Sequence, residues 1–181
     1  MGAVCLYIEC RLQKRPYLLI DFADALKTNL YKLGSVYVKL VKFLHWEKKI
    51  PLLDPSLYIH RFCAKLEFEE KVHEVTTTAL RLLQSMKRDW ICTGRRPNGL
   101  CGAAILCAAR IHKFKRSTHQ VIRAVNVCHE TIRKRIDEFS RTSVAALTEA
   151  EFEQKKNSLE DVGDPMDPPA FIRRMLPKKV P

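Results

Sequence analysis

Residues 93–116 read TGRRPNGLCGAAILCAARIHKFKR, and the apolar part of this stretch indicates the fold class. From Leu100 to His112 the side chains are apolar almost all round a helix, and many of them are small. A helix of that composition is buried on most sides, so other helices must surround it. Its cysteines, Cys101 and Cys107, are expected to act as small core residues. The stretch therefore predicts a central helix in an all-α fold.

Helical periodicity continues on both sides of this central helix. Downstream, residues 118–125 and 128–139 predict two short helices joined by a tight turn, which is the pattern of a helix-turn-helix. Upstream, residues 72–92 predict the longest helix and residues 56–68 the helix before it. The Asp54–Pro55 pair marks its start, because Asp is a good N-cap and Pro suits the first helical position.

The beginning of the chain repeats this order of helices. Residues 3–12, 18–27 and 30–46 predict an apolar helix, a short helix and a longer helix, and a shift of 99 residues aligns them with the later set without a gap. Apolar positions coincide in this alignment: Phe22 with Val121, Leu33 with Ile132, Tyr37 with Ile136 and Leu40 with Phe139. The sequence therefore predicts two related repeats, the first without counterparts of the helices near 56–68 and 72–92.

These patterns divide the chain into four parts. We expect the C-terminal part of a first repeat over residues 1–47, a proline-containing linker over 48–55 and a second repeat over 56–140. The remaining tail, 141–181, predicts a weak helix at 148–156, followed by a Gly- and Pro-rich run that no helix crosses, so most of this tail is expected to be flexible.

The composition narrows the function classes. The chain has 181 residues and a formal net charge of +12, distributed as +5 over residues 1–53, +7 over 54–140 and zero over 141–181. A basic folded part favours a polyanionic partner, with nucleic acid as the leading candidate, although a basic surface can also serve solubility alone. No window is long and apolar enough for a membrane span. The seven cysteines include no Cys-x-x-Cys pair, so no zinc site is indicated. The sequence has no recognisable catalytic motif either, so it does not indicate an enzyme.

Several segments together resemble a known family. Residues 54–90, 93–117 and 121–139, with GAVCLYIECR and LLIDFADALKTNLYKLG before them, resemble the cyclin-box repeats of TFIIB-type transcription factors. TGRRPNGLCGAA and CHETIRKR resemble in particular the TFIIB-related (Brf) subunits of TFIIIB, the initiation factor of RNA polymerase III. The resemblance covers roughly residues 1–153 and implies tandem cyclin-like five-helix repeats, the first incomplete.

The resemblance implies a non-enzymatic nuclear scaffold. Members of the family clamp the TATA-binding protein on promoter DNA and recruit the polymerase, so the implied partners are the TATA-binding protein, promoter DNA, RNA polymerase III and the other TFIIIB subunits, with no membrane and no cofactor. The family's zinc ribbon has no counterpart here, so we expect a core truncated at both ends. A cyclin-like regulatory subunit of a protein kinase shares the fold and is the alternative, although it does not need the basic stretch at 87–116.

Eight basic residues are expected to contact DNA. Two precede the central helix, where free N–H groups at the helix start also suit a phosphate. Three follow the central helix, and three lie in the second helix of the helix-turn-helix, where backbone contact is favoured over sequence readout. The alternative is a solvated basic face. The eight residues are Arg95, Arg96, Lys113, Lys115, Arg116, Arg133, Lys134 and Arg135.

Two further expectations concern apolar side chains. The aromatic residues Trp46, Tyr58, Phe62 and Trp90 are expected in the core rather than stacked on bases. The incomplete first repeat is expected to have an open apolar edge, with Leu6, Leu30, Val36 and Leu40 short of partners.

Overall fold

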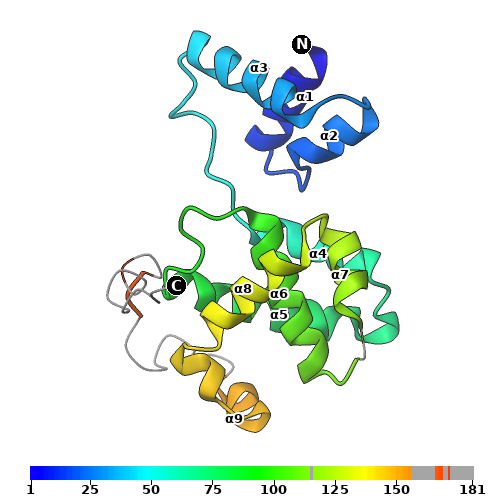
Figure 1. The fold of residues 1–181 in the computed structure, drawn as a ribbon, viewed down its shortest axis with the longest axis vertical. Helices are drawn as coiled ribbons and strands as arrows, with labels where there is room; N and C mark the ends of the chain where they lie inside the picture. The colour runs from blue at the N-terminus through cyan, green and yellow to red at the C-terminus, as the bar shows by residue number, and fades with distance from the viewer. Residues whose placement is uncertain (115, 156–165, 169–170, 172–181) are drawn as a thin grey trace, which may run out of the picture. The chain divides into compact units, whose positions relative to one another are not determined.

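The computed structural model describes residues 1–114, 116–155, 166–168 and 171, and all the regular secondary structure of these residues is helical (Figure 1). The chain forms two compact units, Met1–Tyr58 and Ile59–Pro181, called here the first and the second unit. The expected all-α fold is confirmed. Among the described residues, no helix is long and apolar enough to cross a membrane.

The second unit is built around α6 (Pro97–Ile111), the central helix expected from the sequence. The helices α5 (Val72–Arg88), α7 (Thr118–Val125) and α8 (His129–Phe139) all pack against it (Figure 1). Every α6 residue from Asn98 to Leu106 is buried. Other helices surround α6, which explains why its sequence is apolar all round. Small side chains such as Ala103 and Ala104 let those helices approach closely.

Short local signals set the remaining helix limits of this unit. The helix α4 (Ser56–Lys65) begins as expected, with the carboxylate of Asp54 accepting a hydrogen bond from the Ser56 N–H at 3.1 Å. The 3-10 helix η1 (Glu69–Lys71) then leads into α5. A capping box between Ser117 and Gln120 begins α7, and Asn126 ends it in a left-handed conformation at φ 54°. That residue makes the tight turn between α7 and α8.

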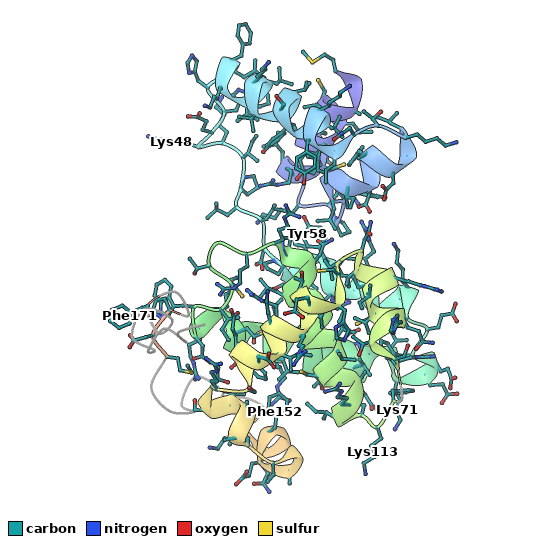
Figure 2. The ribbon with its side chains drawn as sticks, viewed as in Figure 1. Lys48, Tyr58, Lys71, Lys113, Phe152 and Phe171 are labelled. Atoms are coloured by element: carbon teal, nitrogen blue, oxygen red, sulfur yellow. The ribbon has the colours of Figure 1, made fainter. Side chains whose placement is uncertain are left out.

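The tail contributes structure to the second unit. Its first part forms η2 (Ser143–Ala146) and α9 (Glu149–Gln154), the latter close to the expected weak helix. Phe152 of α9 is buried, and its carbonyl accepts a hydrogen bond from the Arg81 guanidinium of α5 at 2.6 Å. The same guanidinium lies 4.2 Å from the centroid of the Phe152 ring, so α9 is attached to α5 (Figure 2 labels Phe152). Residues 156–165, 169–170 and 172–181 of the expected flexible tail lie outside the described residues.

The first unit contains α1 (Gly2–Leu12), α2 (Leu19–Ala25) and α3 (Leu30–Phe43). With the shift of 99 residues, the starts of α2 and α3 coincide with the starts of α7 and α8, in agreement with the internal repeat. Its main core cluster is small and consists of Val4, Ile8, Ala23, Leu33, Val41 and Ile50. Tyr7 and Leu18 are also buried in this unit.

Large apolar side chains are exposed on the first unit. Leu6 is 57% exposed, and Tyr31 and Phe43 are more exposed still, at 79% and 80%. Leu30, Val36 and Leu40, by contrast, pack partly against the small core. An open apolar edge is therefore present at Leu6, whereas the expectation was wrong for the other three side chains, because α1 and α2 give them neighbours.

The difference in core size predicts unequal local stability. We expect native-state amide exchange to protect residues 56–139 much more strongly than residues 1–46, because opening the smaller core exposes less apolar surface. Hydrogen exchange followed by mass spectrometry would measure both segments in one sample. Equal protection in the two segments would contradict this expectation.

Candidate nucleic-acid interface

Seven of the eight basic residues expected at DNA belong to the described residues, and these seven lie in two groups at opposite ends of α6. Contacts of Gly99 with Thr131 and of Arg95 with Glu138 bring α8 to the N-terminal end of α6. Lys113 and Arg116 follow the C-terminal end (Figure 2 labels Lys113). Since α6 has 15 residues, the two groups are separated by about 20 Å along its axis. These seven residues therefore do not form one compact patch.

Two glycines let α8 lie close against α6. A Cβ at Gly99 would come within 2.8 Å of the Thr131 methyl group, and a Cβ at Gly102 within 3.2 Å of the Ile132 side chain. This contact buries Asn98, Gly99 and Leu100 in the first turn of α6. The first turn of α6 is therefore largely buried, and the phosphate site expected at this helix end stays a prediction.

Arg95 and Arg135 are held by one carboxylate. The Arg95 guanidinium donates to Oε1 of Glu138 at 2.8 Å, and the Arg135 guanidinium pairs with Oε2 of the same residue at 3.1 Å. All three side chains are less than one-fifth exposed. Arg95 also donates to the carbonyl of Thr93 at 3.1 Å. This cluster, the Arg95–Glu138–Arg135 triad, fixes the loop before α6 onto α8.

The remaining basic residues of the first group are exposed. Arg96 lies at the N-cap of α6, and Arg133 and Lys134 lie on the outer face of α8. Lys134 faces Glu130 at 3.6 Å, but both side chains are more than half exposed, so this ion pair is weak. Arg96, Arg133 and Lys134 therefore present positive charge to solvent next to the helix-turn-helix.

The second group is only partly exposed. The Arg116 guanidinium donates to the carbonyl of Glu67 and lies 5.7 Å from the centroid of the Phe68 ring, so it joins the loop after α6 to the loop after α4. Lys113 is exposed and adopts φ 59° at the end of α6. Lys115 lies outside the described residues.

Cys128, at the N-cap of α8, was not expected as a feature of this surface. Its Sγ lies 3.0 Å from Oγ1 of Thr131 in an exposed position. Hydrogen bonds from the Thr131 side chain and backbone lower the pKa of this thiol. Burial instead raises the pKa of Cys63 and of Cys107. All seven cysteines are free, and no group of three metal-ligating side chains occurs within the described parts of the chain.

Comparisons with known proteins show the family of the chain. Residues 48–142 match the family model described as Transcription factor TFIIB repeat. The chain is 49% identical to Transcription factor IIIB 90 kDa subunit of Homo sapiens, with 98% of the chain and 26% of that protein aligned. It is 47% identical to Transcription factor IIIB 60 kDa subunit of Schizosaccharomyces pombe, over 94% of the chain and 33% of that protein. Transcription initiation factor IIB of Pyrobaculum islandicum is 32% identical over 78% of the chain and 41% of that protein.

These relatives are transcription factors rather than enzymes, and the comparisons give no support to the alternative of a kinase-binding cyclin. The chain spans about a quarter to a third of the length of the two TFIIIB subunits. The family model covers more than half of the chain, including all of α4 to α8. The chain belongs to the TFIIB repeat family of transcription factors.

Proposed function

We propose that this chain is a nuclear, non-enzymatic binding module of the RNA polymerase III initiation factor TFIIIB. In this role it bridges the complex of the TATA-binding protein with promoter DNA and the polymerase, together with the other TFIIIB subunits. The observation that carries the proposal is the 49% and 47% identity to subunits of Transcription factor IIIB over nearly the whole chain. The net charge of +12 supports a polyanionic partner such as DNA.

We propose different roles for the eight basic residues, seven of which the structure describes. Arg96, Arg133 and Lys134 are the proposed phosphate contacts at the helix-turn-helix, since they are exposed. Lys113, which is also exposed, and Lys115 are proposed for a second contact further along the DNA. Arg95, Arg135 and Arg116 are engaged by groups of the protein itself, so we propose that they position the DNA-facing segments.

A mobility-shift assay over a salt series tests this division. Replacing Arg96, Arg133 or Lys134 singly by alanine is expected to weaken binding to promoter DNA on every sequence alike. Each replacement is also expected to reduce the slope of log K against log salt by about one, because one phosphate contact is lost. The assay uses the whole chain with the TATA-binding protein on promoter DNA.

A variant that is expected to change the DNA affinity in the opposite direction serves as the control. Glu130→Gln removes the carboxylate 3.6 Å from Lys134 and is expected to tighten binding to the same DNA. If the wild-type chain formed no complex with the TATA-binding protein and promoter DNA, or if binding were independent of salt, the proposed function would be wrong.

A further inference from the structure

Trp90 occupies a left-handed backbone position at the end of α5, as Lys113 does at the end of α6. Its N–H donates to the carbonyl of Lys87, and the N–H of Ile91 donates to the carbonyl of Met86 at 2.9 Å, which closes the helix in a Schellman motif. The motif places Trp90 in the left-handed region at φ 56°, where glycine is the favoured residue. A bulky side chain is strained there, so the local backbone gives no reason for a tryptophan.

Packing does not account for the tryptophan either. The next residue, Ile91, is 2% exposed and anchors this turn in the core. Trp90 itself is 52% exposed, so the expectation that it belongs to the core was wrong. Tyr58 and Phe62 are buried as expected, and Trp46 packs partly against the core of the first unit. Trp90 thus presents about half of its surface to solvent beside the loop that leads to Arg96.

The exposed charged residues that flank this tryptophan in the sequence are all positive. Lys87 and Arg96 are exposed on either side of it in the sequence. Asp89 is the only acid between residues 87 and 97, and it is 1% exposed and paired with Arg88 at 3.2 Å. Nucleic acid combines negative phosphates with flat aromatic faces, so a single partner of this class can use the cations and the ring together. Charge and ring therefore fit the polyanionic partner proposed above.

We propose that Trp90 is a stacking platform for an unstacked DNA base, with Arg96 and Lys87 holding the adjacent phosphates. This inference rests on the proposed function and specifies the form of DNA that is recognised at the loop between α5 and α6. A base face is accessible in single-stranded DNA or at a kinked step of a duplex, and both offer the same chemistry to an indole ring. Fully stacked duplex DNA offers no such face.

Fluorescence provides a direct readout, because Trp46 and Trp90 are the only tryptophans. In the whole chain carrying Trp46→Phe, emission comes from Trp90 alone. We expect an oligothymidine single strand to quench this emission strongly, and a fully paired duplex of ordinary sequence to quench it much less. Quenching by a duplex with a flexible TA step would also support the proposal, with a kinked duplex as the source of the base.

Matched variants separate stacking from charge and from folding. Trp90→Leu is expected to weaken single-strand binding about tenfold, while the salt slope stays unchanged because the cations remain. Trp90→Tyr is expected to restore most of the affinity. Phe43→Leu removes a more exposed aromatic ring from the first unit and is expected to have no effect. Circular dichroism confirms that each variant is folded.

Unchanged single-strand affinity in Trp90→Leu would overturn the proposal. So would binding without quenching, or a defect in Trp90→Leu confined to association with the TATA-binding protein. If the wild-type chain still forms its salt-dependent complex on promoter DNA in these cases, the proposed function survives and only the role of Trp90 fails.

Discussion

Replacing Gly99 by alanine is expected to lower the free energy of unfolding by about 2 kcal/mol. Alanine is normally the better helix former by about 1 kcal/mol, so the expected sign is opposite to that of the intrinsic preference. The reason is the 2.8 Å separation between the new Cβ and the Thr131 methyl group, which is shorter than carbon atoms tolerate. Either α8 moves away from α6 or the side chain of Thr131 leaves its position beside Cys128.

A second substitution tests that cause directly. Thr131→Ser removes the methyl group that clashes and keeps the hydroxyl near Cys128, so the double variant is expected to recover most of the lost stability.

Gly34→Ala is the matched control, because the nearest atom, on Leu19, would lie 3.8 Å from the new Cβ. That variant is expected to be as stable as wild type or up to about 1 kcal/mol more stable. Urea denaturation followed by circular dichroism measures all of them. Equal stability of Gly99→Ala and wild type would show that α8 does not pack this closely.

Glu138→Ala is also expected to lower the free energy of unfolding by about 2 kcal/mol. The change leaves the guanidinium groups of Arg95 and Arg135 close together without the carboxylate that both contact. Removing one partner of a fully buried ion pair costs about 3–5 kcal/mol, and the partial exposure of these side chains reduces that cost. Much of the effect is expected to persist in high salt, because groups this far buried are screened only weakly.

Two measurements separate the contribution of the Arg95–Glu138–Arg135 triad to stability from that of exposed charges. Glu130→Ala removes the exposed partner of Lys134 and is expected to change stability by less than about 0.5 kcal/mol. A double-mutant cycle between Glu138→Ala and Arg95→Ala is expected to give a favourable coupling energy of about 1 kcal/mol or more. A coupling near zero would mean that the ion pair does not hold the loop before α6 on α8.

The helices and their order could be predicted from the sequence because both depend on local periodicity. The starts of α2, α3, α7 and α8 fall within about one residue of the expected positions, since capping signals such as Ser117 and Asn29 act over a few residues. The central position of α6 was also predictable, because an apolar helix without a polar face has to be surrounded.

The interface was less predictable because its contacts join residues distant in sequence. Arg95 and Glu138 are 43 positions apart, and neither residue type indicates a partner. For the same reason Arg95 and Arg135 could not be distinguished from the exposed Arg96 and Arg133. The buried first turn of α6 did leave one signal, because a glycine inside an apolar helix often marks the close approach of another segment. Trp90 was assigned to the core because it continued the apolar helical spacing expected over residues 72–92, whereas α5 ends at Arg88 and leaves Trp90 half exposed in the turn that follows.

The attachment of α9 to α5 through Arg81 and Phe152 extends the folded unit beyond the family-model match. The family match ends at residue 142, before η2 and α9 begin. A protein cut at that point would lose both the Phe152 carbonyl and the ring that face the Arg81 guanidinium, leaving part of a buried charge newly solvated. The boundary of a recombinant fragment of this unit therefore belongs after Gln154 rather than at the end of the recognisable repeat.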